Sequence, residues 1–376
     1  MSTLLAGGRK IDAAGVVDDF WALLEEGTIR ATGTGARPPA TTVVELDGDW
    51  LAPGFIDLHC HGGAGACFEH GAAAIVAGLA PHRAAGTTRS VVSLVTARLA
   101  ELEASLDVIA GLSRAEPGIL GAHLEGPFLA DARRGAHDAT ALLAPDPDVA
   151  DRLIDAARGA LVQVTLAPEL PGGLGLVARF VEAGAAVAVG HTEADYATTR
   201  QAFDRGARLV THAFNAMPGI HHREPGPVVA AFDDERTALE LILDGHHVDP
   251  GVGRMAFAAS AGRIALVTDA MAAAGAADGD YRLGPLNVAV RDGIATLRGT
   301  ATIAGSTLTQ DVALRTAITA AGVDPVAAVA ALTAVPARAI GRDDLGLLAP
   351  GRAADAVRLD ATWRVRGVWA AGTAVG

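Results

Sequence analysis

The chain has 376 residues, of which 50% are hydrophobic and 19% are charged, and its formal net charge at pH 7 is −13. This hydrophobic content excludes a disordered chain, and the length suits one barrel of roughly 250 residues with a smaller module attached. The negative charge excludes a sequence-independent nucleic-acid binder, because such a protein needs a basic face against the phosphates.

The sequence also bears on where the protein resides. The first residues, MSTLLAGGRK, lack the charged and apolar segments of a secretory signal, and no stretch reaches the roughly 18 apolar residues of a membrane-spanning helix. The two cysteines, Cys60 and Cys67, favour free thiols over a disulfide framework. We therefore expect a cytoplasmic protein without membrane or nucleic-acid partners.

The two ends of the chain share a pattern of short apolar runs broken by turns. Examples are TVVELDGDWLAPG (42–54) and ADAVRLDATWRVRGVWAAG (354–372). Such runs are typical of short strands. We expect residues 1–52 and 345–376 to pair into one small β-sandwich domain, which leaves residues 53–344 for a second domain.

Between these ends, short β-branched runs alternate with longer helical patterns. This alternation is typical of βα units, whose strands form a parallel sheet. Eight strands close a barrel, so the predicted fold class is α/β with a (β/α)8 TIM-like barrel. The eight runs span residues 54–60, 87–95, 118–124, 161–167, 185–191, 207–213, 238–244 and 263–269.

The clearest helical patterns between these runs span residues 97–112 and 193–206, and the second ends in a glycine suited to a left-handed cap. After the eighth run comes a polar, glycine-rich stretch, 275–301. Two further helical patterns follow at 309–322 and 325–341, and we expect them to close the barrel.

Ionisable residues gather at the carboxyl ends of the predicted strands, where barrel enzymes keep their active sites. His59 and His61 end the first run. Because side chains alternate along a strand, both imidazoles face the same way, toward the barrel axis. Separate runs end in or are followed by Glu125, His191, His212 and Asp269.

A single strand-end histidine is more often a hydrogen-bonded core residue than a ligand. Six such residues at five strand ends are hard to explain as packing, because buried polar groups need partners. Imidazole and carboxylate groups suit Zn²⁺, and Fe²⁺, Co²⁺ or Mn²⁺ are compatible with the same ligand types. The pattern therefore predicts a divalent metal site.

The motifs around these residues resemble the amidohydrolase superfamily. They are PGFIDLHCHGG, HLEGPF, GHT, THAFNAM and TDA. Within that superfamily, the chain resembles the N-acetylglucosamine-6-phosphate deacetylase family from about residue 45 to the end. The motifs that carry this resemblance are, in chain order, HLEGPF, RRGAHD, THAFNAMPGIHHREPG, DGHHVD, LVTDA and TIAGSTLT. Predicted strand four, LVQVTLA, lacks the lysine that dihydroorotase-like and urease-like relatives carboxylate.

The resemblance implies roles for the strand-end residues. Glu125, His191 and His212 would hold the principal ion, and His59 and His61 permit a second ion with Glu125 as the bridge, so that the chain would bind one or two ions. Asp269, also a metal ligand, would be the acid/base that takes a proton from the attacking water and returns it to the leaving amine. His137 would stabilise the oxyanion.

The implied reaction converts N-acetyl-D-glucosamine 6-phosphate to D-glucosamine 6-phosphate and acetate, in amino-sugar catabolism. Arg223 and His247 would bind the phosphate, and in a homodimer one of them would reach the neighbouring active site. From spacing alone, Arg223 can equally be an exposed loop residue and His247 a cap on strand seven. The full set implied to contact substrate is Ala136, His137, Asn215, Ala216, Arg223, His247, Ile303, Ala304 and Gly305.

Two alternatives remain open at this point. The metal ligands alone also suit a deaminase, or a deacetylase of an unphosphorylated amide. The second alternative is a binding protein that kept the fold and lost catalysis, which the presence of Asp269 disfavours.

Overall fold

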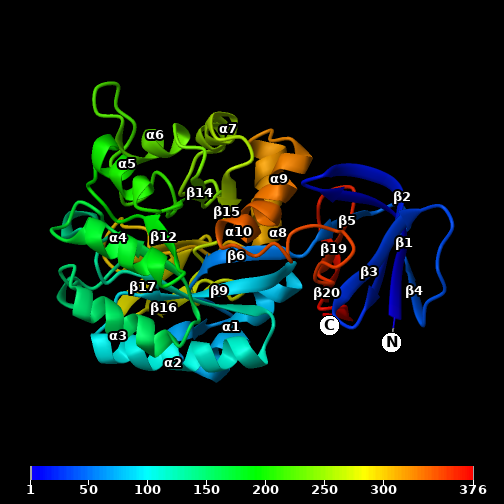
Figure 1. The fold of residues 1–376 in the computed structure, drawn as a ribbon, viewed down its shortest axis with the longest axis horizontal. Coiled ribbons are helices and arrows are strands. Elements are labelled where there is room, and N and C mark those ends of the chain that lie inside the picture. The colour runs from blue at the N-terminus through cyan, green and yellow to red at the C-terminus, as the bar shows by residue number, and fades with distance from the viewer. Residues whose placement is uncertain (1, 376) are drawn as a thin grey trace.

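The computed structural model describes residues 2–375 (Figure 1). Eight parallel strands form one sheet at the eight predicted places, which confirms the barrel. In sheet order, and also in chain order, they are β6 (Phe55–Cys60), β9 (Thr87–Val95), β10 (Ile119–Glu125), β11 (Leu161–Leu166), β12 (Ala186–Val189), β13 (Leu209–Val210), β14 (Ala238–Leu241) and β15 (Ile264–Leu266).

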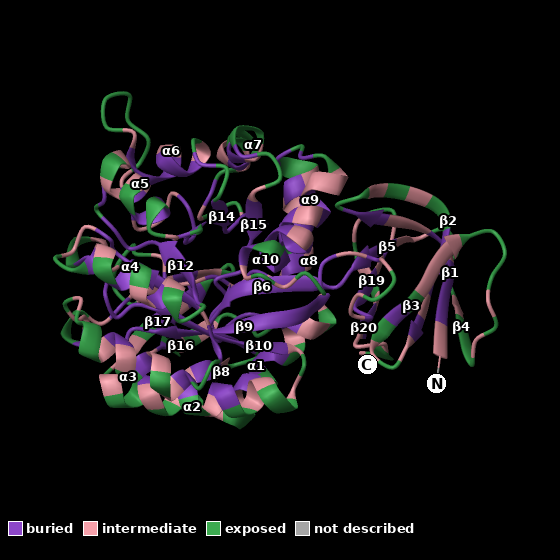
Figure 2. Ribbon diagram, viewed as in Figure 1, coloured by how far each residue is buried: buried purple, intermediate pink, exposed green. Residues whose placement is uncertain are grey.

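The two outer strands of this order, β6 and β15, come together just beyond β15. Cys60 forms a parallel bridge with Ala270, and the Asp269 N–H donates to the His59 carbonyl at 2.8 Å. The sheet is therefore a nearly closed barrel, whose strand residues are buried except for the half-buried Leu120 and Val162 (Figure 2).

The last four barrel strands are shorter than predicted, at two to four residues each. The apolar pattern continues past them, but the backbone leaves the extended region. His191, His212 and Asp269 have positive φ values of 48°, 28° and 48°. Such values are uncommon outside glycine and end a strand ladder.

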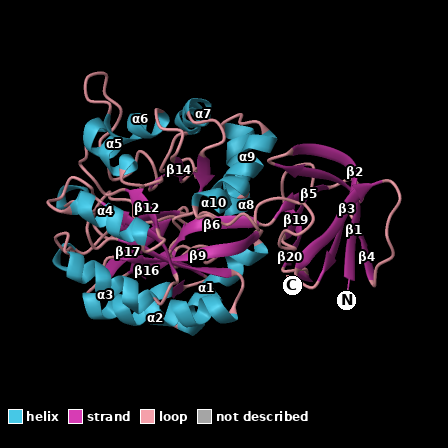
Figure 3. Ribbon diagram, viewed as in Figure 1, coloured by secondary structure: helices cyan, strands magenta, loops and turns pink. Residues whose placement is uncertain are grey.

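Seven helices follow the barrel strands and cover the outside of the sheet (Figure 3). The predicted helices 97–112 and 193–206 correspond to α2 and α5, and α5 begins at Tyr196 because the Asp195 side chain accepts a hydrogen bond from Thr198 N at 2.7 Å. The helices are α1 (Ala72–Ala84), α2 (Leu99–Ala115), α3 (Pro147–Ala157), α4 (Gly173–Glu182), α5 (Tyr196–Asp204), α6 (Gly226–Phe232) and α7 (Pro250–Ala259).

The two predicted final helices are both interrupted, so these two predictions were wrong in detail. The pattern at 309–322 is α8 (Gln310–Arg315) followed by a π-helical turn, Thr316–Ala320. The pattern at 325–341 is two helices, α9 (Pro325–Leu332) and α10 (Ala334–Ala339), separated by Thr333 at φ −133°. Pro336 lies in the first turn of α10, where its missing N–H is tolerated. Both α9 and α10 contact β15 and β6, as expected for helices that close the barrel.

The glycine-rich stretch after the eighth strand is more ordered than its composition suggests. It forms a three-stranded antiparallel sheet, and Val288, Val290 and Ala295 of this sheet pack with Met271 and Ala304. This small sheet therefore has its own hydrophobic core beside the barrel mouth. Its strands are β16 (Gly279–Leu283), β17 (Leu286–Arg291) and β18 (Ile294–Leu297).

The two ends of the chain lie in one further sheet, beside the barrel in Figure 1. β5 joins them, because it pairs with β1 on one side and antiparallel to β19 on the other. The strands are β1 (Ser2–Asp12), β2 (Gly15–Glu25), β3 (Thr28–Thr34), β4 (Thr42–Glu45), β5 (Trp50–Pro53), β19 (Ala356–Leu359), β20 (Val365–Ala370) and β21 (Thr373–Ala374).

Leu5, Phe20 and Trp369 contribute to the hydrophobic core of this sheet, so residues from both termini share it. The remaining strands, β7 (Gly62–Gly63) and β8 (Ala66–Cys67), form a short hairpin after β6. Cys60 and Cys67 are both buried and free. Within residues 2–375, no helix combines the length and the apolar character needed to cross a membrane.

Candidate active site

A cavity of about 390 Å³ opens at the carboxyl ends of the barrel strands. Of the six predicted metal ligands, five line it, and His59 lies buried directly beneath. The ligand atoms fall into two sets, each within 4.8 Å. The first set is Glu125, His191 and His212, and the second is His59, His61 and Asp269.

The first set comes from the end of β10 and from the segments that follow β12 and β13. His191 Nε2 and His212 Nε2 lie 3.0 Å apart, and they lie 3.0 and 3.1 Å from the same Glu125 oxygen, Oε1. All three side chains are at least nine-tenths buried. The two imidazole nitrogens and the carboxylate oxygen, all side-chain atoms, therefore form a small triangle of potential metal ligands.

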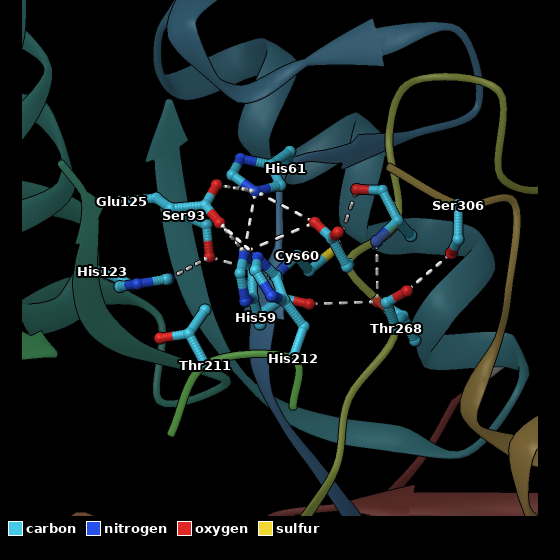
Figure 4. Close-up of polar contacts among 12 residues, drawn as sticks. His59, Cys60, His61, Ser93, His123, Glu125, Thr211, His212, Thr268 and Ser306 are labelled. Atoms are coloured by element: carbon cyan, nitrogen blue, oxygen red, sulfur yellow. Dashed lines mark hydrogen bonds and ion pairs between the residues drawn. The ribbon is translucent and has the colours of Figure 1, made fainter. Parts of the chain in front are cut away.

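The second set is built mainly on β6. His59 Nε2 and His61 Nε2 lie 3.0 Å apart, and Asp269 Oδ1 lies 3.4 and 3.3 Å from them. The Glu125 carboxylate lies between the two sets, because Oε1 is 3.4 Å from His59 Nε2 and Oε2 is 3.2 Å from His61 Nε2 (Figure 4). One carboxylate thus faces both sets.

These separations fit the coordination of a metal ion. Tetrahedral ligands at about 2.0–2.1 Å from Zn²⁺ lie about 3.3 Å from one another, close to the spacing within each set. His191 Nδ1 lies 2.8 Å from the Arg133 carbonyl, which can only accept, so the proton is on Nδ1 and the Nε2 lone pair faces the set. The residues therefore fit up to two ions that share Glu125.

The electrostatics of the site favour a bound cation. Burial raises the pKa of Asp269, but the charge of His59 and a hydrogen bond from His61 outweigh it and lower that pKa to about 2. Burial opposes a charge on His61, but its bonds to Asp269 and Glu125 raise its pKa to about 10. The two carboxylates thus stay ionised and hold positive charge between them.

His137 is placed differently from the ligand histidines. Burial lowers its pKa to about 4, so the ring is neutral at pH 7. The Thr96 N–H donates to His137 Nδ1 at 3.2 Å, which leaves the ring proton on Nε2. This Nε2–H points toward Glu125 Oε2 at 3.3 Å, at the edge of the cavity, where it can donate to an oxygen of a ligand.

Most of the residues predicted to contact substrate line the same cavity. They are Ala136, His137, Asn215, Ala216, His247, Ile303 and Gly305. Ala304 is buried instead in the small core under β16–β18. Arg223 is not among the cavity residues, because it lies on the exposed loop before α6, with Nη1 2.7 Å from His222 Nε2.

Several buried or half-buried residues that support these side chains were not predicted from the sequence. Asp57 accepts from the Thr268 hydroxyl at 2.6 Å and from the His59 N–H at 3.2 Å, which ties β6 to the segment after β15. Glu240 faces His59 from β14, and Asp244 pairs with His247 at 2.7 Å. Asp57 and Glu240 each interrupt an apolar run of the sequence, and this pattern could have indicated a buried polar role for them.

The chain belongs to the amidohydrolase family, whose sequence model matches residues 50–375. That family implies a divalent metal ion, and the two ligand sets are candidates to hold it.

Individual relatives narrow the comparison. The N-acetylgalactosamine-6-phosphate deacetylase of Escherichia coli O157:H7 is 37% identical over 377 residues, with 99% of each chain covered. The N-acetylglucosamine-6-phosphate deacetylase of Vibrio furnissii is 32% identical, with 93% of this chain and 89% of the relative covered. A solved structure is that of a mutant N-acetyl-D-glucosamine-6-phosphate deacetylase from Mycobacterium smegmatis in complex with N-acetyl-D-glucosamine-6-phosphate. It is 40% identical to this chain, covers 99% of both chains and superimposes with a TM-score of 0.95.

Proposed function

We propose that this protein hydrolyses the acetamide of N-acetyl-D-glucosamine 6-phosphate, releasing D-glucosamine 6-phosphate and acetate in amino-sugar catabolism. The observation that carries the proposal is that the two ligand sets, the second of which includes Asp269, meet His137 at one cavity. The deacetylases that cover nearly the whole chain at 32–40% identity support the substrate class.

The metal in this proposal is Zn²⁺, with Fe²⁺, Co²⁺ or Mn²⁺ compatible with the same ligands. Glu125, His191 and His212 would hold the first ion, and His59, His61 and Asp269 the second, with Glu125 shared. When bound, such an ion makes water acidic enough to be deprotonated near neutral pH and polarises a carbonyl oxygen.

The protein's own groups would move the protons. Asp269 is ionised at neutral pH and takes the proton of the water whose oxygen attacks the acetamide carbon. The His137 Nε2–H donates to the carbonyl oxygen as its negative charge develops. The carbon–nitrogen bond then breaks as Asp269 gives its proton to the departing nitrogen, which leaves an amine and acetic acid. The second proton of the water then passes from the acid to the amine, so that the products leave as acetate and an ammonium group.

The phosphate would be held at the cavity rim. Burial opposes a charge on His247, but the hydrogen bond to Asp244 and the charge of that carboxylate raise the His247 pKa above its ordinary value. Arg223, on its exposed loop, would bind the phosphate in the neighbouring active site of a homodimer. Asn215, Ala216 and Gly305 would contact the sugar, together with Ala136, Ile303 and Ala304.

We further propose a cytoplasmic location, which two free, buried thiols favour. We also propose that residues 1–52 and 345–376 act as one small domain beside a catalytic domain of residues 53–344. The pairing of β5 with both β1 and β19 supports this division.

The Escherichia coli relative supports a second candidate substrate, N-acetyl-D-galactosamine 6-phosphate. Acetate release should be measured side by side from both phosphorylated sugars and from unphosphorylated N-acetylglucosamine. We expect the highest kcat/KM with N-acetylglucosamine 6-phosphate. A higher value with the galactosamine epimer would select the second candidate, and an equal value without phosphate would contradict the phosphosugar assignment. Release from none of them would contradict deacetylation itself.

A further inference from the structure

Glu240 is a fully buried carboxylate on β14, directly beneath the second ligand set. Its neighbours along the strand, Leu239 and Leu241, are buried and apolar. Removing an ionised carboxylate from water is costly unless several donors satisfy it, and an apolar residue would pack such a position at lower cost. Glu240 therefore calls for a role beyond packing.

Three donors surround the Glu240 carboxylate. His59 Nδ1 lies 3.2 Å from Oε2, and the His212 backbone N–H donates to the same oxygen at 3.4 Å. Gln163 Nε2 donates to Oε1 at 2.6 Å from β11. One carboxylate thus touches a residue from each ligand set, and Gln163 fixes its orientation.

The contact with His59 determines which ring nitrogen carries the proton. A carboxylate only accepts, so His59 keeps its proton on Nδ1 and turns the Nε2 lone pair toward His61 Nε2, 3.0 Å away. In the other tautomer, the Nε2 proton would occupy the space that an ion needs. His61 has no such support, because its Nδ1 has no hydrogen-bond partner within the described part of the chain.

We propose that Glu240 is a positioning residue that holds His59 in its metal-binding tautomer and so determines whether the second ion binds. The inference rests on the proposed second ion at His59, His61 and Asp269. Gln163 supports the same arrangement, because its side chain donates a hydrogen bond to the Glu240 oxygen that does not face His59. Carboxylate partners of this kind commonly orient metal-bound imidazoles.

The test exchanges the two side chains. In Glu240→Gln, a neutral amide with one oxygen replaces a carboxylate that accepts from three donors, so the hold on the His59 Nδ1–H weakens and Gln163 must turn its own oxygen toward the new N–H₂ group. In the double variant Glu240→Gln with Gln163→Glu, the new glutamate accepts from the amide N–H, and the amide oxygen again accepts from His59. Gln163→Glu alone, which brings two carboxylates together, completes the cycle.

Zn²⁺ bound per chain should be measured by elemental analysis and by competition with a chelating dye, together with thermal unfolding of each metal-free variant. We expect wild type to bind two ions. Glu240→Gln should keep one ion and bind the other about 10–100-fold more weakly. The double variant should recover part of that affinity, which a merely structural role for Glu240 would not produce.

Three outcomes would overturn the inference. Glu240→Gln could bind both ions with wild-type affinity, or it could lose both ions equally and show no recovery in the double variant. Wild type could also bind a single ion, in which case the second-ion proposal fails together with this one. Acetate release by that wild-type protein would still support the proposed function, so the two failures are distinguishable.

Discussion

Two regions of the molecule contain buried charged groups that are satisfied in different ways. Where the barrel meets the small sheet, Arg89 on β9 pairs with Asp355 at 2.5 and 3.2 Å, and Asp355 also accepts from the Ala371 N–H at 2.7 Å. At the barrel mouth, the imidazole nitrogens of each ligand set lie 3.0 Å apart. Both ligand sets share one carboxylate, that of Glu125.

The difference indicates what each region is built for. Charges that are matched by fixed partners satisfy one another, so nothing further needs to bind at such a joint. Charges and lone pairs that converge without enough protein partners need a ligand. Substitutions at the joint should therefore change stability alone, and substitutions at the mouth should change catalysis and metal content.

The largest expected effect is at the mouth. Asp269→Asn keeps the shape of the side chain but cannot take a proton, so we expect kcat for acetate release to fall by about 10²–10⁴-fold. Steady-state kinetics on the phosphorylated substrate would measure it. Asp18→Asn, an exposed change in the small sheet, is the matched control and should be unaffected. Wild-type turnover in Asp269→Asn would rule out the acid/base role.

The joint should respond in stability. Arg89→Met leaves Asp355 buried without its cation, and we expect the free energy of unfolding to fall by about 3–5 kcal/mol. Denaturant unfolding checks this, and the double change Arg89→Met with Asp355→Leu should restore much of the loss. If Arg89→Met instead lowered kcat/KM of the folded protein as strongly as a change at the mouth, the division between the two regions would be wrong.

A smaller effect on kcat/KM is expected when the proposed phosphate-binding arginine is removed. Arg223→Ala should lower kcat/KM for the phosphorylated substrate by about 10–100-fold, the worth of a hydrogen bond to a charged group. Activity on the unphosphorylated sugar is the internal control and should not change. Mixing Arg223→Ala with Asp269→Asn protomers should restore part of the activity if the arginine serves the neighbouring subunit, and no recovery would place its action within its own chain.

The smallest effect concerns pH. Because the folded-state pKa of His247 is raised, the ring keeps its charge to a higher pH than an ordinary histidine and loses it as the pH rises through the raised pKa. The KM for the phosphorylated substrate should therefore increase at alkaline pH, by about fivefold, which is the difference between a charge-assisted and a neutral hydrogen bond. His247→Gln should remove this alkaline increase. An unchanged pH profile in that variant would show that His247 does not bind the phosphate.

Sequence patterns predicted the barrel well where a strand is long and its residues stay extended. The predicted boundaries of β9, 87–95, agree with the structure, whereas 207–213 contains only a two-residue strand. The apolar pattern could not reveal that His212 and Phe214 adopt positive φ values of 28° and 78°. These values depend on tertiary contacts rather than on local preference.

The same limit applies to the candidate site. Alternation along β6 was enough to predict that His59 and His61 share a face, and their Nε2 atoms do lie together. The link from His59 to Glu240 spans 181 positions of the chain, so no local pattern contains it. The order in the 275–301 stretch was also missed, because its three short strands are stabilised by packing against Met271 and Ala304.

The most direct test of the central claim compares metal content and activity in one preparation. The protein should be stripped with a chelator, reloaded stepwise with Zn²⁺, and assayed at each step for acetate release from N-acetylglucosamine 6-phosphate. We predict that the stripped protein is inactive and that activity returns as the metal content rises to two ions per chain. Full activity in the stripped, folded protein would contradict a metal-dependent deacetylase.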